Sequence, residues 1–421
     1  MPKFLRSLPV LALAITAATR LGAEARYLHL EIGDPERRNQ TVPLAIDTIV
    51  DSRSGETLTP AELAVRLAET RIVFVGESHT SIEFHNAQLR LIQELHRAGR
   101  EVLIGLEMYP YTRQQPLDDW TAGHYTEEGF VALSHWYDNW GYHWNYYREI
   151  FDFARRNQLQ MLAVNAPRKV VSEVRKKGFE NLTEEEAAHI PADIDTDSAE
   201  HRQLFKSYFD EEDILHFGMS DEQWEGMFKA QCTWDATMGF NSVRGLEARG
   251  GEDAIMVVLI GSGHVAYGLG IERQSAQWFD GQMASVIPTP VRDDEGELIA
   301  EVQASYADFV WGLPAETEAL YPSLGLSTKT TDDGELEVIL VSEETAAERA
   351  GFATGDVLLA VDGHPLAGKE DLATAQSHWR WGDATRLSVR RGEETLELAV
   401  EFKRREPDES ALDHAPDSAE E

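Results

Sequence analysis

The sequence of 421 residues has very little cysteine, because Cys232 is the only one. One thiol allows no disulfide within the chain, so a packed core must hold the fold together. Cys232 stands in a helical stretch among tryptophan and apolar residues, which favours a buried structural thiol over a nucleophile. Beyond its N-terminus the chain also lacks any apolar run of the about 20 residues that a membrane-spanning helix needs. We therefore expect no membrane span in the mature protein.

Basic residues are scarce as well. The chain has 38 Lys and Arg against 74 Asp and Glu, a formal net charge of −36. Such a charge repels nucleic acid and anionic lipid, so neither is an expected partner. Hydrophobic residues make up 42% of the chain, which excludes wholesale disorder. The length predicts two or three domains, each able to bury a core.

Residues 1–25 have the three parts of a secretory signal peptide. Lys3 and Arg6 supply positive charge, residues 8–18 are apolar but too short to span a bilayer, and Ala23-Glu24-Ala25 fits a cleavage site. Cleavage there would leave Arg26 as the first residue. No cysteine follows the apolar part, so no lipid anchor is predicted. We expect a periplasmic or secreted protein, with an uncleaved anchor as the alternative.

Short apolar runs alternate with helical patterns through the first two thirds of the chain. Four runs are typical of buried strands, and they lie at 72–75, 102–106, 161–164 and 255–260. Strands separated by helices predict an α/β fold with a mostly parallel sheet flanked by helices. Thr59 followed by Pro60 and Glu62 predicts the capped start of the helix before the first strand.

The same patterns predict the domain limits. After the signal peptide, residues 26–311 form the α/β domain, whose last strands fall within 285–311. Residues 312–322 contain glycine and prolines and are predicted to be a linker. A small β-rich domain is expected over 323–403. The acidic residues 404–421 are expected to be a disordered tail.

Polar residues suited to a functional site follow the predicted strands. Glu77 and His79 follow the first strand, Glu107 follows the second, and His264 follows the fourth. Because ligands of open α/β sheets bind beyond the carboxyl ends of the strands, we predict that these four side chains share one rim. Each residue alone has an ordinary structural interpretation, and it is the set that favours a site.

Two kinds of chemistry are open to this set. His79, Glu107 and His264 have the side chains of a divalent metal site, which would activate a bound water. Histidine and glutamate can also act without metal as a general acid and base. A second unusual feature is the aromatic stretch 136–147, which is either a packed layer over the sheet or the wall of a site for a flat ligand. Tyrosine and histidine are both possible axial ligands of haem iron.

The residues around these motifs resemble the ChaN family of haem-binding uptake proteins, within the Tiki and erythromycin esterase superfamily. The resemblance covers about residues 45–290 and includes two Gly-x-x-His motifs. The matching pieces are RIVFVGESHTSIEFHNAQ (71–88), GLEMYP (105–110), the Trp/Tyr stretch ending near Tyr147, AVNAPRKV (163–170), the segment from Trp234-Asp235 to Met238, and VVLIGSGHVAYGLGI (257–271).

The resemblance implies haem as the cofactor, with a tyrosine that meets the iron. Tyr267 is the candidate for that role, and His85, Tyr109 and Asn165 are further candidates for contact with the cofactor. Relatives in the superfamily hydrolyse their substrates, in some cases with a metal such as Mn, Co or Zn. Carried to this chain, their catalytic positions are Glu77, His79, Glu107 and His264. A homodimer is also possible.

The C-terminal domain resembles a PDZ domain over 323–403. The matching signature runs through Ala350-Gly351-Phe352, Gly355-Asp356-Val357-Leu358 and Val361-Asp362-Gly363. Leu324, Gly325 and Leu326 match the loop that receives the carboxylate at the end of a peptide. The implied partner is a C-terminal peptide or a protein that ends in one. The alternative is pairing with the chain itself or with a second subunit.

Three functional hypotheses follow. The first is an exported haem-binding protein, related to iron uptake, with a PDZ domain that recruits a partner. The second is a metal-dependent hydrolase or peptidase that uses the Glu/His rim. The third is a non-catalytic adaptor in which the PDZ domain does the binding.

Overall fold

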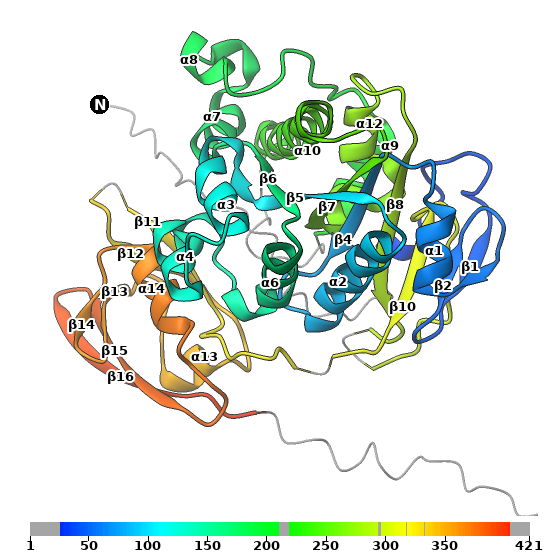
Figure 1. The fold of residues 1–421 in the computed structure, drawn as a ribbon. Helices are drawn as coiled ribbons and strands as arrows, with labels where there is room; N and C mark the ends of the chain where they lie inside the picture. The colour runs from blue at the N-terminus through cyan, green and yellow to red at the C-terminus, as the bar shows by residue number, and fades with distance from the viewer. Residues whose placement is uncertain (1–25, 210–218, 294–295, 317, 332, 405–421) are drawn as a thin grey trace, which may run out of the picture. The chain divides into compact units, whose positions relative to one another are not determined.

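The computed structural model describes residues 26–209, 219–293, 296–316, 318–331 and 333–404. The predicted signal peptide therefore lies outside the described residues, as does the predicted tail except for its first residue. The described chain divides into two compact units, with the boundary between Ala319 and Leu320. Figure 1 shows the elements of both units. Within the described residues, none of the helices combines the length and the apolar character that crossing a membrane requires.

The first unit is built on an eight-stranded sheet of order β3-β2-β10-β8-β4-β7-β5-β6. The strands from β10 to β6 run parallel, and β2 and β3 add antiparallel pairs at one edge. The predicted α/β fold with a mostly parallel sheet is thus confirmed. The bounds are β2 Ile49–Asp51, β3 Thr57–Leu58, β4 Ile72–Glu77, β5 Glu101–Pro110, β6 Gln160–Asn165, β7 Ala254–Gly261, β8 Met283–Pro290 and β10 Phe309–Leu313.

The central strands are buried along their whole length. All residues of β4 and of β7 are buried, as expected for parallel strands covered on both faces. Strand β10 extends to Leu313, two residues into the segment 312–322 that was predicted to be a linker. A separate pair of short strands, β1 (Thr41–Pro43) and β9 (Glu301–Gln303), joins the N-terminal segment to the end of the unit.

Helices cover both faces of this sheet. Figure 1 shows α2 (Ile82–Arg97) and α6 (Arg148–Asn157) on one face and α10 (Asp221–Arg249) on the other. The predicted cap is present at α1 (Pro60–Arg66), where Thr59 and Glu62 form a capping box. The remaining elements are η1 Arg26–His29, η2 Tyr111–Arg113, α3 Gln114–Thr121, α4 Glu127–Leu133, α5 Trp136–Asn139, η3 Trp144–Tyr146, α7 Arg168–Lys177, η4 Phe179–Asn181, α8 Glu184–Ala187, α9 Ala199–Ser207, α11 Ser262–Val265, η5 Ala266–Gly268 and α12 Ile271–Ser275.

The aromatic stretch 136–147 divides its side chains between two roles. Trp136 and Trp144 are 0% and 4% exposed and pack with ring centroids 4.9 Å apart. Phe151 lies 4.8 Å from Trp144 and extends this layer onto α6. The prediction of a packed aromatic layer is correct for these rings. Trp140 and Tyr142 have another environment, beside His79.

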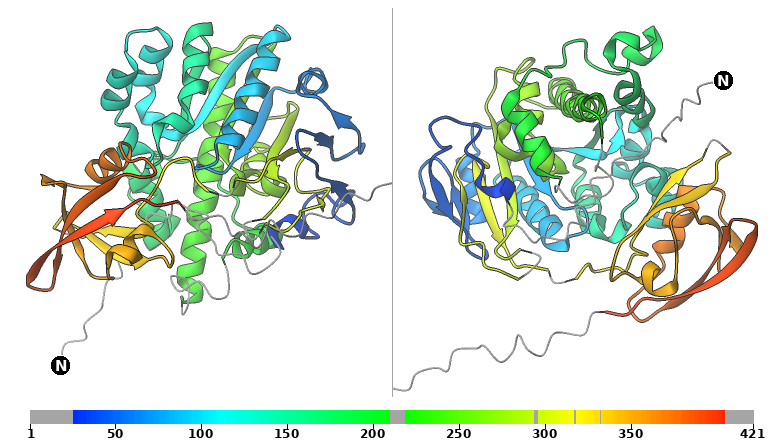
Figure 2. Two further views of the ribbon diagram at one scale, coloured as in Figure 1. Left: turned by 90° about the horizontal axis from the view of Figure 1, so that it is seen from below. Right: turned by 180° about the vertical axis from the view of Figure 1, so that it is seen from behind.

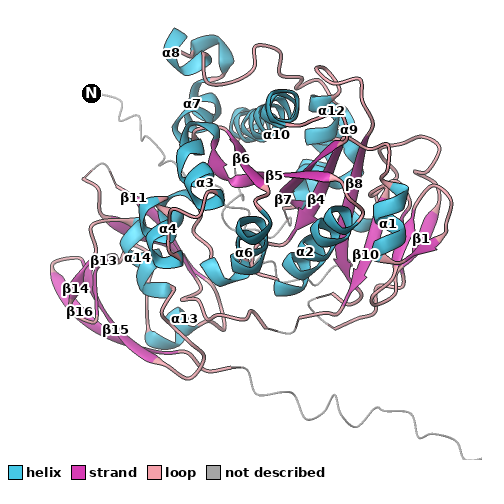
Figure 3. Cartoon of the chain, viewed as in Figure 1, coloured by secondary structure: helices cyan, strands magenta, loops and turns pink. Residues whose placement is uncertain are grey.

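The second unit is a six-stranded antiparallel sheet of order β11-β12-β13-β15-β16, with β14 paired to β13. Figure 2 shows β15 and β16 as a long hairpin in orange and red, and Figure 3 shows the two helices of the unit in cyan. Strand β11 lies at the edge of this sheet. The bounds are β11 Leu326–Thr330, β12 Leu336–Val341, α13 Ala346–Ala350, β13 Val357–Val361, β14 His364–Pro365, α14 Lys369–Gln376, β15 Ala384–Arg391 and β16 Glu394–Glu401.

Candidate functional site

Glu77 is the last residue of β4, and its side chain is 0% exposed. Its Oε1 accepts hydrogen bonds from His79 Nδ1 at 2.8 Å and from the Tyr147 hydroxyl at 2.6 Å. Its Oε2 accepts from Gln88 Nε2 at 2.9 Å, and His85 Nδ1 lies 3.6 Å from the same oxygen. Both oxygens of this buried carboxylate are therefore satisfied.

These partners decide the charge of Glu77. Burial by itself would raise the pKa of Glu77, but the charges of His85 and His79 and the hydrogen bonds from His79 and Tyr147 outweigh it. Together they lower the pKa to about 2. Glu77 is thus a fixed anion at neutral pH, and it orients the His79 ring by holding Nδ1.

His79 keeps one ring nitrogen available. No hydrogen bond to Nε2 is present among the described residues, and the side chain is 16% exposed. The ring lies 4.7 Å from the Trp140 ring and 4.7 Å from the Tyr142 ring, measured between centroids. Burial lowers the pKa of His79, but the hydrogen bond to Glu77 and the charge of Glu107 reverse this, so the pKa is raised.

Glu107 and His264 meet at the ends of the neighbouring strands β5 and β7. Glu107 Oε2 accepts a hydrogen bond of 2.7 Å from the backbone N–H of Gly261, which fixes the carboxylate in place. His264 Nε2 lies 3.5 Å from the other carboxylate oxygen of Glu107. The imidazole of His264 therefore faces Glu107 with one nitrogen and the protein interior with the other.

The inner nitrogen of His264 is held by α10. His264 Nδ1 lies 2.5 Å from Asp235 Oδ1 and 2.9 Å from Gln231 Nε2. Burial lowers the pKa of His264, but the charge of Asp235 and its hydrogen bond outweigh this and raise it. Asp235 is thus the counterpart of Glu77, a buried carboxylate that orients an imidazole through Nδ1.

Asp235 differs from Glu77 in its second oxygen. Asp235 is 0% exposed, and its Oδ2 has no hydrogen-bond partner among the described residues. The group facing Oδ2 is His201, whose Nε2 lies 3.6 Å away. Burial, the largest cause, lowers the pKa of His201 to about 4, so this imidazole is neutral at pH 7. The carboxylate is therefore only half satisfied.

The structure brings the four predicted rim residues together. A Cβ added to Gly261 would lie 3.2 Å from His79 Cε1 and 3.7 Å from Glu107 Oε2, so His79 and Glu107 flank the same glycine. Glu77 bonds to His79, and His264 faces Glu107. The physical reason is that β4, β7 and β5 are adjacent parallel strands, so their carboxyl ends meet at one edge.

The predicted metal set has no support from this geometry. Among the described residues there is no group of three or more His, Cys, Asp and Glu side chains arranged to hold a metal ion. The carboxylates Glu77 and Asp235 are bonded to the imidazoles rather than gathered around a shared centre. The arrangement is that of hydrogen-bonded imidazole–carboxylate pairs, which can accept and donate protons.

The four residues predicted to contact the cofactor have other partners. The Tyr267 hydroxyl donates to Tyr27 O at 2.6 Å and accepts from Leu30 N at 3.0 Å, so it is bonded to the backbone of the N-terminal segment. The Tyr109 hydroxyl donates to Ser134 Oγ at 2.7 Å. The position of a residue after a strand could be read from the sequence, but its inward direction could not.

The other two predicted contacts also point into the protein. His85 is 2% exposed, with Nδ1 at 3.2 Å from Gln88 Oε1 and Nε2 at 3.3 Å from His79 O. Asn165 donates from Nδ2 to Glu107 O at 2.8 Å. Both residues support the rim by holding its backbone, and neither directs its bonded polar group outward.

The residues present would suit haem better at His79 than at Tyr267. A ligand of haem iron needs a lone pair with no competing partner, and in the neutral ring His79 Nε2 would offer one while Nδ1 is held by Glu77. The Trp140 and Tyr142 rings beside it are suited to pack against a flat ligand. In Tyr267, by contrast, burial raises the pKa of the phenol, which opposes the charged form that binds iron.

Sequence reasoning missed several side chains of this site. Asp235 and Gln231 lie four residues apart on α10 and are buried on a helix packed against the sheet. That spacing of two polar residues among apolar neighbours was a usable signal. Tyr147 and Gln88 gave no such signal, because their bonds to Glu77 depend on how α6 and α2 pack.

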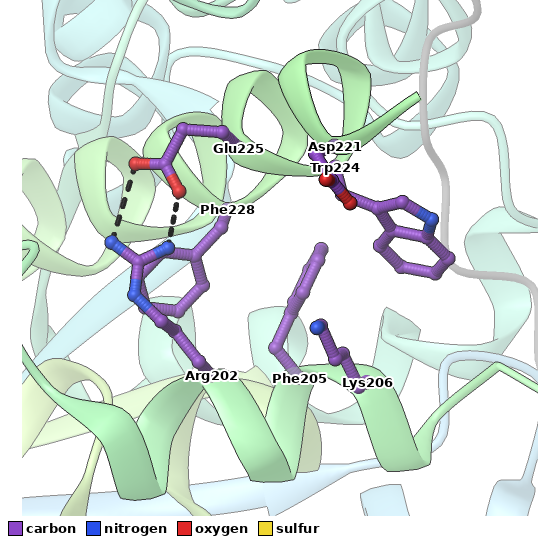
Figure 4. A pocket seen from close by; sticks show the side chains of 7 residues that line it. All are labelled: Arg202, Phe205, Lys206, Asp221, Trp224, Glu225 and Phe228. Atoms are coloured by element: carbon purple, nitrogen blue, oxygen red, sulfur yellow. Dashed lines mark hydrogen bonds and ion pairs between the residues drawn. The ribbon is translucent and has the colours of Figure 1, made fainter. Parts of the chain in front are cut away.

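A small cavity lies away from the rim, between α9 and the start of α10. Its volume is about 170 Å³, below the about 300 Å³ of a small-molecule pocket. Figure 4 shows Arg202 joined to Glu225 across one side of it. None of the rim residues lines it; the lining residues are Arg202, Phe205, Lys206, Asp221, Trp224, Glu225 and Phe228.

Residues 63–274, half of the chain, match the family described as haem-binding uptake, Tiki superfamily, ChaN. The chain belongs to this family. Residues 322–402 match the PDZ domain family. Members of the ChaN family are haem-binding proteins, so the family membership is consistent with haem as a ligand of this chain.

Individual relatives are distant. The chain is 24% identical over 262 residues to the chloroplastic protein RETICULATA-RELATED 5 of Arabidopsis thaliana. The matched region covers 58% of this chain and 34% of that protein. The match thus spans about a third of that relative. A solved ChaN of Campylobacter jejuni, described as binding haem cofacially, shares 15% identity with a TM-score of 0.48, covering 64% of this chain and 98% of that one. An HtrA3 PDZ domain bound to a phage-derived ligand shares 24% identity with this chain at a TM-score of 0.17. The match covers 19% of this chain and 82% of that domain.

Proposed function

We propose that this chain is an exported haem-binding protein with a role in iron uptake, whose PDZ unit recruits a partner. The observation that carries the haem part is His79, the rim imidazole that has one nitrogen without a partner among the described residues and two aromatic rings packed beside it. Membership of a haem-binding family supports the same assignment.

In this proposal each residue around His79 has a defined task. His79 would hold the group through Nε2, and haem would supply an iron centre that can bind an imidazole nitrogen. Glu77 holds the proton on Nδ1, so in the neutral ring the lone pair is on Nε2. Tyr147 and Gln88 hold Glu77 in turn, so the imidazole is oriented before any ligand arrives.

A spectroscopic titration of the mature protein with ferric haem tests this proposal. We expect a haem absorption band in the wild type and at least a tenfold lower affinity in His79→Ala. His124→Ala is the matched control, because His124 is 66% exposed and pairs with Asp119. Equal affinity of His79→Ala and wild type, or no band in the wild type, would contradict the proposal.

Export rests on the charged, apolar and small-residue parts of segment 1–25. We expect the mature chain to begin at Arg26. N-terminal sequencing of protein from cell fractions measures this directly. An intact Met1 in the membrane pellet would refute export with cleavage.

The PDZ part rests on the loop before β11. The carbonyls of Leu324 and Gly325 accept hydrogen bonds from Ala347 N at 2.8 Å and Ser342 N at 2.9 Å. Because a trans peptide sets its N–H opposite its carbonyl, the N–H groups of Gly325 and Leu326 point away from these donors. Gly325 has a φ of 77°, a conformation that glycine adopts without strain. With β11 at the sheet edge, this loop suits the carboxylate of an extended peptide.

The expected partner is therefore a peptide with a free C-terminus. Peptides bound to the full mature chain should lose most of their affinity when the C-terminus is amidated, because the backbone donors lose a charged acceptor. Binding can be followed by fluorescence anisotropy of labelled peptides. Equal binding of amidated and free peptides would count against this part of the proposal.

A second candidate function is metal-free hydrolysis at the rim. The observation that favours it is the pair of imidazoles, each held through Nδ1 by a buried carboxylate and placed beside Glu107. Two oriented imidazoles and a carboxylate can divide the roles of general base and general acid. Hydrolysis of 4-nitrophenyl acetate that survives a chelator and falls in His264→Ala would support it. Activity that a chelator abolishes would contradict it.

A further inference from the structure

We propose that the hydroxyl of Tyr142 donates a hydrogen bond to an acceptor oxygen of the ligand, in a carbonyl or carboxyl group, beside the His79 ring. This inference rests on the second candidate function, in which the rim takes a substrate with a carbonyl group. It assigns Tyr142 as a residue that touches the substrate and Gly261 as the residue that lets His79 and Glu107 pack beside one another.

The first observation is an unsatisfied hydroxyl. The Tyr142 oxygen is buried, and it has no hydrogen-bond partner within the described residues. Buried polar groups in native proteins are nearly always bonded, so an exception calls for an explanation. Tyr147 provides the contrast, because its hydroxyl donates to Glu77 at 2.6 Å. Tyr147 thus donates to a group of the protein, whereas the hydroxyl of Tyr142 has no acceptor within the described residues.

The second observation places this donor at the rim. The Tyr142 ring packs 4.7 Å from the His79 ring and 5.3 Å from the Trp140 ring. Burial raises the pKa of Tyr142, and the nearby charges of Glu107 and Glu77 raise it further, against a smaller opposing effect of the Arg168 charge. The phenol therefore keeps its proton and can donate a hydrogen bond to an acceptor.

The third observation is the close packing at Gly261. A Cβ at this position would lie 3.2 Å from His79 Cε1, 3.5 Å from His79 Nε2 and 3.7 Å from Glu107 Oε2. Its φ of −54° is one that any residue adopts, so the backbone conformation does not demand glycine here. The absence of a side chain instead lets His79 and Glu107 pack against the same stretch of backbone, so both side chains lie beside one position.

These three features define a subsite for a carbonyl or carboxyl oxygen. His79 and Glu107 both lie beside Gly261, and Tyr142 adds a neutral donor next to His79. A donor aimed at a carbonyl oxygen becomes more valuable as negative charge develops there, provided that it is already in place. The hydroxyl of Tyr142 is held by its packed ring and meets that condition.

The test compares Tyr142→Phe with Tyr147→Phe in the full mature chain. Both substitutions remove one hydroxyl and keep the ring. Because the Tyr142 hydroxyl bonds to nothing in the protein, Tyr142→Phe should leave the urea midpoint unchanged or raise it, whereas Tyr147→Phe should lower it. An equal loss of stability in the two variants would overturn the proposal, since it would show an internal partner for Tyr142.

Binding is measured with acetate and acetamide, followed by the imidazole NMR signals of His79. We expect Tyr142→Phe to weaken the binding of these probes at least tenfold. The kcat/KM for 4-nitrophenyl acetate should also fall at least tenfold. Tyr125→Phe is the control, because its hydroxyl bonds to Asp119, on α3. Equal probe binding by wild type and Tyr142→Phe, or no binding by wild type, would overturn the subsite.

Gly261→Ala tests the close packing at this glycine. The added methyl carbon would lie 3.2 Å from His79 Cε1, so it should displace the His79 ring and reduce probe binding at least tenfold, while Gly368→Ala, which has open space around its Cβ, should change nothing. Full binding by Gly261→Ala would overturn the proposed position. If the ester is not hydrolysed while acetate still binds through Tyr142, the hydrolytic function fails and the subsite stands.

Discussion

In both halves of the rim a buried carboxylate holds an imidazole, but the two carboxylates differ in how many hydrogen bonds they receive. In one half Glu77 holds His79 through Nδ1, and in the other Asp235 holds His264 in the same way. Both carboxylates are 0% exposed at the side chain. Glu77 receives three hydrogen bonds across its two oxygens, whereas Asp235 has one oxygen without a hydrogen-bond partner among the described residues.

This difference predicts that the Glu77 carboxylate contributes more to stability and that the hydrogen bonds of Asp235 can change more easily. A buried carboxylate with every acceptor satisfied is strongly stabilised as an anion, and removing it leaves several donors unpaired. A half-satisfied carboxylate contributes less to stability and can change its bonding at lower cost. We infer that the Glu77 half is the rigid half of the site, and that the Asp235 half can respond to the protonation of His264.

The largest expected effect is on stability in Glu77→Gln. The pKa of Glu77 is lowered from 4.5 to about 2, which corresponds to about 3 kcal/mol of stability at pH 7. Because the pKa is depressed in the folded state, this contribution is present above pH 4.5 and is lost as the pH falls toward 2. Urea unfolding should show that the difference in free energy of unfolding between wild type and Glu77→Gln is smaller at pH 3 than at pH 7. A difference that does not change with pH would contradict the lowered pKa of Glu77.

Tyr147→Phe should have the next largest effect, within the same half. Its hydroxyl donates at 2.6 Å to a buried anion, and such bonds contribute about 2 kcal/mol. The loss should appear as a lower urea midpoint at pH 7. In the double variant with Glu77→Gln the two losses should not add, because both remove the same interaction. Strict additivity would show that the hydroxyl acts elsewhere.

Asp235→Asn should change stability less, by about 1 kcal/mol, because the amide oxygen can still accept from His264. Its main effect should be on titration. Asp235 raises the pKa of His264, so the variant should lower that pKa toward 6.5, as NMR titration would measure. The stability that comes from a raised pKa is present below pH 6.5 and is lost as the pH rises through the folded value. An unchanged pKa of His264 in this variant would show that Asp235 does not hold His264 as Glu77 holds His79.

The smallest expected effect concerns Cys232, on the Asp235 side. The thiol is 0% exposed and its sulfur lies 3.9 Å from His201 Nδ1, and burial raises its pKa. A thiol reagent should therefore leave the folded wild type unmodified and label it fully in urea. Asp235→Asn should label slightly faster than wild type under native conditions. Rapid labelling of folded wild type would refute the prediction of a buried structural thiol.

Much of the architecture could be predicted because it depends on local pattern. The run Ile72 to Val75 and the run Ile255 to Ile260 became fully buried parallel strands, as continuous apolar sequence indicates. The capping box at Thr59 was predicted from three residues of sequence and is present. The convergence of His79 and His264 also followed, because parallel strands carry their ends to one edge.

The orientation of side chains was harder to predict. Tyr267, His85 and Tyr109 follow strands or lie near them, but their polar groups are bonded inside the protein. Position along the chain says that a residue is near the rim, and it does not say which way the side chain turns. That choice depends on packing against segments far away in sequence, such as the contact of Tyr267 with Tyr27.

The sequence by itself determined the strands, their helical covering, the rim at their carboxyl ends and the PDZ unit. Each of these follows from periodicity, turn residues or a short motif. Only the tertiary structure decided which carboxylate holds which imidazole. Glu77 meets Tyr147 across 70 positions of the chain, and Asp235 meets His264 across 29. Such bonds form because the aromatic stretch and α10 pack onto the sheet, and hydrogen bonds at that separation leave no local pattern to read.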